Sequence, residues 1–288
     1  MNKEFLDLAE QLKSSVSCTV RLNELMSGHT SFKIGGPADI LVLPESIEQL
    51  REVLKVVKET VVPLTLLGNG SNVLVRDKGI RGIVIKLGNM LRHFYEAEDL
   101  LVFGSGYSLA LASYKAMECG KTGMEFAVGI PGSIGGAVYM NAGAYDGEMQ
   151  NIVNCVKVMD LQGNERVLTA EELNFGYRKT SLQNSGLIVT EVTLKMPSGD
   201  KDEIKSKMDD FSHRRISKQP LEMPSAGSMF KRPPGYFAGT LIDQAGLKGY
   251  TVGGAQISTK HAGFVVNVGG ATAADVLQLI KDVQTKIK

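Results

Sequence analysis

The chain has 288 residues, which is enough for one large domain or for two to three small ones. Its 32 lysines and arginines nearly balance its 31 aspartates and glutamates, and no long basic tract is present, which argues against non-specific binding to nucleic acid or to an anionic membrane surface. Hydrophobic residues make up 43% and charged residues 22% of the chain, as is usual for soluble globular proteins.

The N-terminal segment and the cysteine content indicate a cytoplasmic protein without a metal site. Acidic residues interrupt positions 1–8, where a secretory signal needs an unbroken apolar run, and no other stretch is long and apolar enough to span a bilayer. Cys18, Cys119 and Cys155 are an odd, widely spaced set that suggests neither a disulfide framework nor a zinc site. The four histidines are also scattered.

The hydrophobic pattern predicts helices and short strands in the first half of the chain. A first helix is expected over residues 3–13, and Ser46 is the expected N-cap of an amphipathic helix over residues 47–59. Three β-rich runs predict strands, at residues 64–67, 73–75 and 83–85. A helix over residues 109–119 is expected to end at Gly120.

The second half of the chain contains a composition break at residues 197–199, which we interpret as a domain boundary. Strands are expected at residues 156–159, 166–168, 187–194 and 264–268. Helices are expected at residues 200–215 and 239–245. Thr272 and Asp275 form a capping box that opens a final helix over residues 273–286. Because helices and strands are mixed throughout, we expect an α+β chain with at least two domains.

The first of two glycine clusters stands between two strand-like runs. It consists of Gly68, Asn69, Gly70, Ser71 and Asn72. It is not a Rossmann fingerprint, because Val73 occupies the place of the third glycine and a strand is expected to follow. Its backbone N–H groups could still form an anion-binding nest, with added side-chain donors. Taken alone, the cluster is better interpreted as a hairpin turn built on Asn-Gly.

The second cluster is longer and has little side-chain bulk. It consists of Gly129, Ile130, Pro131, Gly132, Ser133, Gly135 and Gly136. A loop of this composition suits a flat ring or a pyrophosphate better than it suits a connector, because the ligand can approach the backbone closely. The alternative is a long structural loop, which is uncommon without a function. Two such clusters together favour a dinucleotide ligand.

A series of further motifs extends this pattern over most of the chain. The motifs are residues 30–36, 68–72, 129–136, 141–145, 176–178, 226–231 and 242–249. In order and spacing they resemble the UDP-N-acetylenolpyruvoylglucosamine reductase family, whose members are also called UDP-N-acetylmuramate dehydrogenases. The short interval from Arg178 to Ser228 is similar to the second type of this family, which lacks a substrate-covering insertion.

The resemblance implies a fold and an activity. The expected fold is the vanillyl-alcohol-oxidase-like (PCMH-type) FAD-binding fold, with two subdomains over residues 1–85 and 86–197 and a C-terminal α+β substrate-binding domain over residues 198–288. FAD is expected to bind non-covalently at the two glycine clusters. NADPH would reduce the FAD, and the reduced flavin would convert UDP-N-acetylglucosamine enolpyruvate to UDP-N-acetylmuramate for peptidoglycan synthesis.

The resemblance also assigns roles to individual residues. Arg178 would stabilise the enolate, and Ser228 would donate the proton; the planar charged fork of arginine suits a carboxylate, whereas serine is a weak acid that needs stabilising neighbours. Four residues would contact the UDP-sugar: Tyr145, Tyr177, Lys231 and Lys248. The residues alone allow a surface arginine, a capping serine, a core tyrosine and a solvated lysine. We expect His261 to support structure.

The resemblance fails at one point. The family has a third catalytic residue, a glutamate after the final helix, and the sequence offers no matching glutamate before it stops at Lys288. We expect that the protein continues beyond this residue, and we assign the role to no other glutamate. Two rival functions stay open: a flavoenzyme of the same fold that oxidises a hydroxy acid or sugar, and an inactive flavin-binding or UDP-sugar-binding module.

Overall fold

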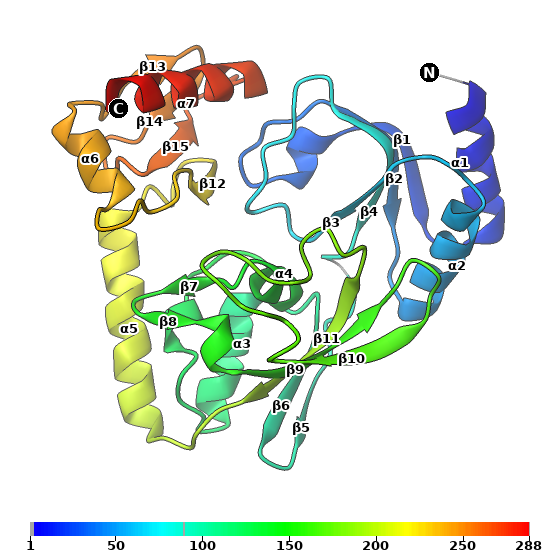
Figure 1. Ribbon diagram of the computed structural model, residues 1–288, viewed down its shortest axis with the longest axis horizontal. Helices are drawn as coiled ribbons and strands as arrows, with labels where there is room; N and C mark the ends of the chain where they lie inside the picture. The colour runs from blue at the N-terminus through cyan, green and yellow to red at the C-terminus, as the bar shows by residue number, and fades with distance from the viewer. Residues whose placement is uncertain (1–2, 89, 288) are drawn as a thin grey trace. The chain divides into compact units, whose positions relative to one another are not determined.

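The structure of the protein is a computed structural model that describes residues 3–88 and 90–287 (Figure 1). The chain forms two compact units, called the first and the second unit below. The first contains Met1–Leu22, Ile40–Asn69 and Gly82–His213, and the second contains Asn23–Asp39, Gly70–Arg81 and Arg214–Lys288. The domain boundaries expected after residues 85 and 197 stay predictions.

A four-stranded sheet and two helices form the N-terminal part of the fold. The elements are α1 (Lys3–Ser15), β1 (Thr19–Leu25), β2 (Pro37–Leu43), α2 (Ile47–Lys58), β3 (Leu64–Leu67) and β4 (Ile80–Lys86). The strand order is β1-β2-β4-β3, and β3 runs parallel to β4. Leu50 and Leu54 share one face of α2 and are buried in one cluster with Ile83. The helix begins at Ser46, whose Oγ accepts a hydrogen bond from the Gln49 N–H at 3.2 Å.

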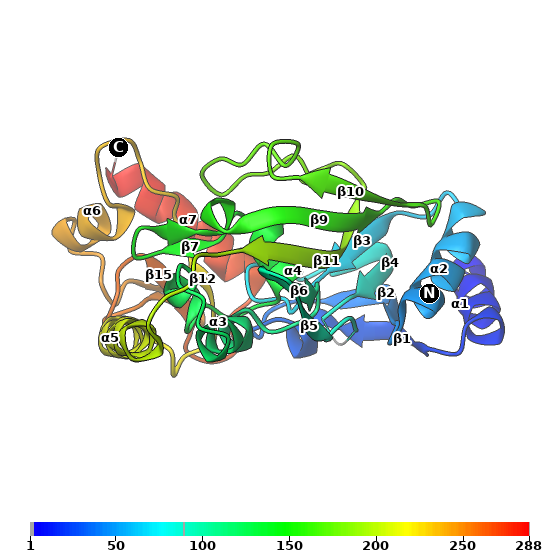
Figure 2. The same cartoon turned by 90° about the horizontal axis from the view of Figure 1, so that it is seen from below.

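A five-stranded sheet forms the larger part of the first unit. The elements are β5 (Phe94–Ala97), β6 (Leu100–Gly104), α3 (Leu109–Glu118), α4 (Ile134–Tyr139), β9 (Val153–Met159), β10 (Glu165–Thr169) and β11 (Ile188–Lys195). The strand order is β10-β9-β11-β6-β5, with antiparallel pairing throughout, and Figure 2 shows β9, β10 and β11 side by side. Helix α4 packs against β6 and β11. Phe103, Val138 and Val192 are among the fully buried side chains of this core.

Short elements lie between α3 and β9, and a long helix follows β11. They are η2 (Glu125–Ala127), β7 (Gly143–Ala144), β8 (Gly147–Glu148) and η3 (Met149–Asn151), and the helix is α5 (Lys201–Lys218). Strands β7 and β8 pair with each other as a two-stranded ribbon. Ile204, Met208 and Phe211 recur at helical spacing on α5 and pack around Val128. This face of α5 is therefore part of the first unit.

The second unit is built on a four-stranded antiparallel sheet. Its elements are η1 (Met26–His29), β12 (Ser225–Ser228), α6 (Ala238–Gln244), β13 (Thr251–Val252), β14 (Ala255–Ile257), β15 (Phe264–Asn267) and α7 (Ala273–Ile287). The strand order is β12-β15-β14-β13. Ile257 and Val265 of the sheet and Val276 and Leu279 of α7 form the buried core. The alternation of strands and helices in both units is that of the expected α+β class.

Most of the expected elements are confirmed. Helix α3 ends before Gly120, whose φ of +67° is the left-handed conformation that stops helices. The capping box of α7 is also present, because the Thr272 N–H donates to Asp275 at 2.9 Å and the Asp275 N–H donates to the Thr272 hydroxyl at 3.1 Å. The strands β1, β2, β5, β6, β7, β8, β12, β13 and β14 and the helix α4 were not expected from the sequence.

The strand expected at residues 73–75 is wrong. These residues lie in an irregular segment between β3 and β4. Leu74 packs into the core of the second unit, and Val75 is buried with its Cβ 2.9 Å from the position of a Cβ on Gly35. The apolar character of the segment therefore serves side-chain packing, and none of the described strands pairs with it.

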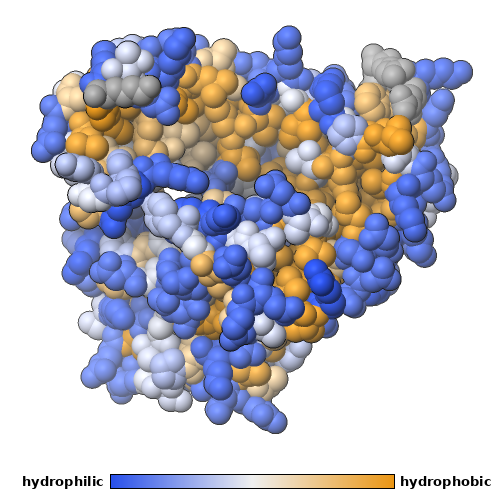
Figure 3. All heavy atoms as spheres, in the orientation of Figure 1, coloured by the Kyte–Doolittle hydropathy of each residue, from blue (hydrophilic) through white to orange (hydrophobic). Residues whose placement is uncertain are grey.

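Polar and apolar residues are interspersed on the face shown in Figure 3. Within the described part of the chain, no helix combines the length and the apolar character needed to cross a membrane.

The N-terminus of α7 provides a test of the second unit. The carboxylate of Asp77 accepts hydrogen bonds from the N–H groups of Ala273 at 2.7 Å and Ala274 at 2.9 Å, which have no partner inside the helix. We expect Asp77→Ala to lower the free energy of unfolding by about 1 kcal/mol, as the loss of a helix cap does. Urea unfolding measures this. Lys78→Ala, at a neighbouring exposed side chain, should change it by less than about 0.5 kcal/mol; equal losses would contradict the capping role.

Candidate functional site

The two glycine clusters meet in the first unit. A Cβ on Gly68 would lie 3.3 Å from the Ser133 Oγ, so the start of the first cluster lies beside the second. A Cβ on Gly88 would collide with the side-chain oxygen of Asn69, which shows that this side chain is packed closely against the Gly88 backbone. The structure thus brings together two segments that lie far apart in the sequence.

The rest of the first cluster, Gly70, Ser71 and Asn72, belongs to the second unit. Gly70 has a φ of +70°, and a side chain there would collide with the carbonyl oxygen of His29. Its own carbonyl oxygen accepts a hydrogen bond from the Ser31 N–H at 3.0 Å. Because β3 and β4 are parallel, the hairpin-turn interpretation of this cluster is wrong.

The second cluster is part loop and part helix. Residues 129–132 are irregular, but Ser133 is the N-cap of α4 and accepts a hydrogen bond from the Gly136 N–H at 3.3 Å. The expectation of a continuous loop is therefore wrong from Ile134 onward. Gly135 is buried against Ser105. Its N–H donates to the Ser105 carbonyl at 2.9 Å, and a Cβ on Gly135 would lie 2.7 Å from the Ser105 Cβ.

The geometry of this cluster fits a phosphate-bearing cofactor. The N–H groups of Ile134 and Gly135 donate to the protein backbone. Within the described residues, those of Gly132 and Ser133 have no acceptor, and Gly132 has a φ of +130° that a side chain would strain. Free backbone donors in a segment without bulky side chains are what an anionic diphosphate requires. Gly136 is exposed, so a flat ring could approach α4 closely.

Arg178 lies in a tight turn of the first unit, closed by backbone hydrogen bonds between Gly176 and Lys179. Its guanidinium group donates to the carbonyl oxygens of Asn141 at 3.0 Å and Gly143 at 2.7 Å. The Arg178 Cζ lies 5.3 Å from the centroid of the Tyr177 ring. A guanidinium has five N–H groups, so the two backbone contacts fix its orientation and leave donors for a carboxylate.

Asn141 is fully buried and connects this turn to the loop that follows α4. Its amide nitrogen donates to Glu148 at 3.2 Å and to the Gly176 carbonyl at 3.1 Å, and its amide oxygen accepts from the Gln150 N–H at 3.0 Å. The sequence placed Asn141 inside a motif without giving it this role. The nearby polar and glycine residues gave no signal of which loop the amide would reach.

Backbone strain is concentrated around the same segment. Five non-glycine residues there have a left-handed φ: Asn141 (+41°), Tyr145 (+51°), Asp146 (+63°), Asn174 (+44°) and Arg178 (+55°). Residues in this conformation cost free energy and are retained where the surroundings fix them, often at functional sites. The strain therefore supports a functional role for this part of the first unit.

The two candidate tyrosines have different surroundings. The Tyr145 ring stacks on Phe211 with centroids 4.4 Å apart, and its hydroxyl donates to the Phe211 carbonyl at 3.2 Å. These contacts agree with the packing alternative for this tyrosine. Tyr177 is 55% exposed, so most of its ring is accessible to a ligand.

The remaining candidates lie in the second unit. Ser228 ends β12 and is exposed, and its hydroxyl is 3.5 Å from the carbonyl oxygens of Phe230 and Gly263, which is long for such a hydrogen bond. The Lys248 Nζ pairs with Asp243 at 2.7 Å. Lys231 is exposed and forms no ion pair within the described part of the chain. Ser228 thus presents a weakly engaged hydroxyl.

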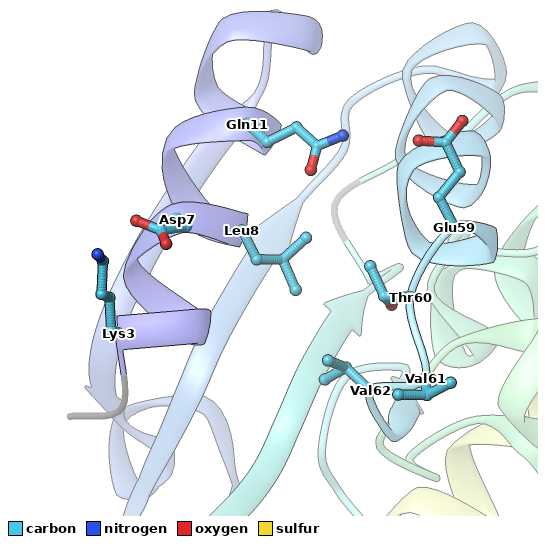
Figure 4. A pocket seen from close by; sticks show the side chains of 8 residues that line it. All are labelled: Lys3, Asp7, Leu8, Gln11, Glu59, Thr60, Val61 and Val62. Carbon is cyan, nitrogen blue, oxygen red and sulfur yellow. The ribbon is translucent and has the colours of Figure 1, made fainter.

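A separate pocket of the first unit is formed by α1 and the segment after α2 (Figure 4). Its side chains are Lys3, Asp7, Leu8, Gln11, Glu59, Thr60, Val61 and Val62. None of them belongs to a sequence motif, and they carry charges of both signs. Among residues 3–88 and 90–287, no group of three or more His, Cys, Asp or Glu side chains could hold a metal ion.

Two comparisons with known proteins identify the fold. A family model described as an FAD binding domain matches residues 38–169. A solved variant of berberine bridge enzyme matches the fold with a TM-score of 0.50 at 15% identity, over 68% of this chain and 44% of its own. The chain therefore has the PCMH-type FAD-binding fold.

The family follows from closer relatives. A model described as the C-terminal domain of UDP-N-acetylenolpyruvoylglucosamine reductase matches residues 219–288. Reductases of that name from Clostridium perfringens strain SM101 and Clostridioides difficile strain 630 are 50% and 49% identical, over 99% and 93% of this chain and 93% and 88% of their own lengths. The solved reductase of Thermus caldophilus has a TM-score of 0.80 at 40% identity, over 93% of this chain and 94% of its own. The chain belongs to this family.

The packing of α4 gives a prediction. Gly135→Ala introduces a methyl group 2.7 Å from the Ser105 Cβ, so we expect it to lower the free energy of unfolding of the flavin-free protein by about 1–3 kcal/mol. Gly136→Ala is the matched control, because its Cβ would meet only the Ser133 Oγ, at 3.4 Å. This variant should be as stable as the parent or more stable, since alanine is the better helix former. Equal destabilisation in urea unfolding would contradict the close contact.

Proposed function

We propose that the protein reduces UDP-N-acetylglucosamine enolpyruvate to UDP-N-acetylmuramate with electrons from NADPH, in the synthesis of peptidoglycan precursors. The observation that carries the proposal is the 50% identity, over 285 residues, to a reductase named for an enolpyruvyl UDP-sugar. The candidate arginine and serine, and both glycine clusters, lie inside the matched length.

The residues that would hold FAD are those of the two clusters. The free N–H groups of Gly132 and Ser133 would bind its diphosphate, and the exposed backbone at Gly136 would face a flat ring. When bound, FAD accepts a hydride from NADPH and delivers one to the enolpyruvyl double bond. The chain must then stabilise the negative charge that develops on the substrate and supply one proton to the neighbouring carbon.

Arg178 would stabilise the developing enolate. Its side chain is oriented by the carbonyl oxygens of Asn141 and Gly143, so its remaining donors need little rearrangement to meet a carboxylate. Such preorganisation makes charge stabilisation effective, because the donors do not have to be reoriented during the reaction. Tyr177 would contact the UDP-sugar, and Tyr145 would also contact it, since the residue is only partly buried beside Phe211.

Ser228 would supply the proton. Its long contacts to Phe230 and Gly263, both 3.5 Å, leave the hydroxyl able to turn toward a substrate carbon. Serine is a weak acid, so a cation must stabilise the oxyanion left behind. Lys231, close to Ser228 along the chain, and Lys248 are the proposed cations of the second unit.

Product analysis tests the proposed function. The purified protein is incubated with NADPH and UDP-N-acetylglucosamine enolpyruvate, and the product is identified by mass spectrometry. The proposal expects UDP-N-acetylmuramate in one-to-one ratio with the NADPH consumed. Turnover of a simple alcohol, sugar or hydroxy acid, without turnover of the enolpyruvyl compound, would establish a different flavoenzyme. Bound flavin that NADPH cannot reduce would indicate a binding module.

Ser228→Ala should separate the two half-reactions. We expect reduction of FAD by NADPH to stay close to the parent rate, while reoxidation by the enolpyruvyl substrate slows about 10²–10⁴-fold, the usual contribution of a proton donor. Stopped-flow absorbance measures both rates. Ser225→Ala, in the same strand, is the control and should leave both unchanged. Equal slowing of both half-reactions by Ser228→Ala would show that the serine is structural.

Arg178→Ala should affect the same half-reaction. Loss of one charge-stabilising group costs on the order of 3 kcal/mol, so we expect reoxidation by substrate to slow roughly 10²-fold in single turnover. The neighbouring Lys179→Ala is the control, because the Lys179 side chain is exposed. Thermal unfolding of each variant checks the fold. An unchanged reoxidation rate in a folded Arg178→Ala variant would refute the role.

A further inference from the structure

The ribbon of β7 and β8 (Figure 1) places Glu148 opposite Gly143. Tyr145 and Asp146 join the two strands, and their φ values of +51° and +63° are those of a two-residue type I′ turn. The type and length of such a turn fix the register of the strands that it joins. The pairing of Glu148 with Gly143 is therefore set by the local backbone.

The carboxylate of Glu148 accepts a hydrogen bond from the buried amide of Asn141. The Asn141 Nδ2 donates to the Glu148 Oε2 at 3.2 Å. Glu148 is partly buried, and its side chain has no other hydrogen bond or ion pair among residues 3–88 and 90–287. An ionised carboxylate is only an acceptor, so it selects the orientation of the amide in which the nitrogen faces β8. The amide oxygen is then directed to the Gln150 N–H, from which it accepts at 3.0 Å.

Both carbonyl groups that orient Arg178 belong to residues in contact with Glu148. The Arg178 guanidinium donates to the Asn141 carbonyl at 3.0 Å and to the Gly143 carbonyl at 2.7 Å. The Gly143 backbone packs directly on Glu148, because a Cβ on Gly143 would lie 2.6 Å from the Glu148 Cβ. One side chain of β8 therefore contacts both residues whose main chain holds the guanidinium.

We infer that Glu148 is a positioning residue for Arg178, holding through Asn141 the carbonyl groups that aim the guanidinium at the substrate carboxylate. The inference rests on the proposed function. A guanidinium presents its donors in a rigid fork, so a shift of the carbonyl groups that hold one edge turns the other edge as well. Charge stabilisation is effective when the donors already point to the place where the charge develops. Glu148 acts only through Arg178 and needs no contact with substrate or flavin.

The reach of the Glu148 side chain, and not its charge, is what the contact with Asn141 requires. Glutamine keeps an acceptor oxygen at the same distance from the backbone and removes the charge. Aspartate keeps the charge but is one methylene shorter, and alanine has no acceptor, so both leave a buried amide donor without its partner. Positioning therefore predicts that Glu148→Gln retains function better than Glu148→Asp. A role of the negative charge predicts the reverse order.

Single-turnover reoxidation of the reduced flavin by UDP-N-acetylglucosamine enolpyruvate is the main readout. We expect Glu148→Ala and Glu148→Asp to slow it roughly tenfold and Glu148→Gln to stay within about threefold of the parent, because a misplaced catalytic group costs less than a missing one. Reduction of FAD by NADPH should be unchanged in all three. Asp146→Asn is the matched control: it removes an exposed negative charge from the same ribbon, asparagine tolerates the left-handed φ, and neither rate should change.

The same substitution in the Arg178→Ala protein shows whether Glu148 acts through the arginine. There Glu148→Ala should slow reoxidation by less than about twofold further, because the group that it positions is absent. The full loss in that background, parent-like reoxidation in Glu148→Ala, or a larger defect in Glu148→Gln than in Glu148→Asp would overturn the inference. If Glu148→Ala does not fold, the order of the other two variants decides. A parent enzyme that NADPH reduces but the enolpyruvyl substrate cannot reoxidise would instead refute the proposed function, and with it this inference.

Discussion

The buried amide of Asn141 holds together the segment on which the candidate Arg178 depends. Its nitrogen and oxygen bind Glu148, the Gly176 carbonyl and the Gln150 N–H. A buried amide with a missing partner costs about 1–3 kcal/mol, so these contacts are maintained together or lost together. They fix the distance between the segment after α4 and the turn that carries Arg178. Asn141 and Arg178 both have a left-handed backbone conformation, and this network holds them in it.

Close backbone packing is the second constraint on the candidate site. Gly135 can approach Ser105 only because it has no Cβ, and a Cβ on Gly68 would lie 3.3 Å from the Ser133 Oγ. This packing brings the start of the first cluster beside the second cluster within the first unit, where, among the described residues, the N–H group of Gly132 has no acceptor. A side chain at Gly135 would collide with Ser105, and one at Gly68 would crowd the Ser133 hydroxyl. The close packing therefore depends on the absence of a side chain at these glycines.

The local features of the fold could be predicted from the sequence, whereas the non-local ones could not. Helix α2 and the capping box of α7 depend on residues a few positions apart, so the pattern shows them directly. The apolar run at residues 73–75 carried the same signal as a strand, because burial by packing and burial by pairing select similar side chains. The parallel pairing of β3 with β4, which excludes a hairpin, is a long-range contact that no local pattern contains.

Some features of the candidate site could also be predicted from the sequence, whereas others could not. The sequence indicated the glycine clusters and, through family resemblance, Arg178 and Ser228. It did not show that α4 begins inside the second cluster or that Tyr145 stacks on Phe211. The stacking of Tyr145 on Phe211 depends on residues 66 positions apart that the folded chain brings together.

The most direct test of the reductase assignment is the absorbance of the bound flavin without oxygen. The purified protein should show a yellow flavin spectrum that NADPH bleaches, and addition of UDP-N-acetylglucosamine enolpyruvate should restore the colour rapidly. Bleaching followed by this recovery is the result that the account predicts. A purified protein that neither contains nor binds flavin, or a reduced flavin that the enolpyruvyl compound leaves bleached, would contradict it.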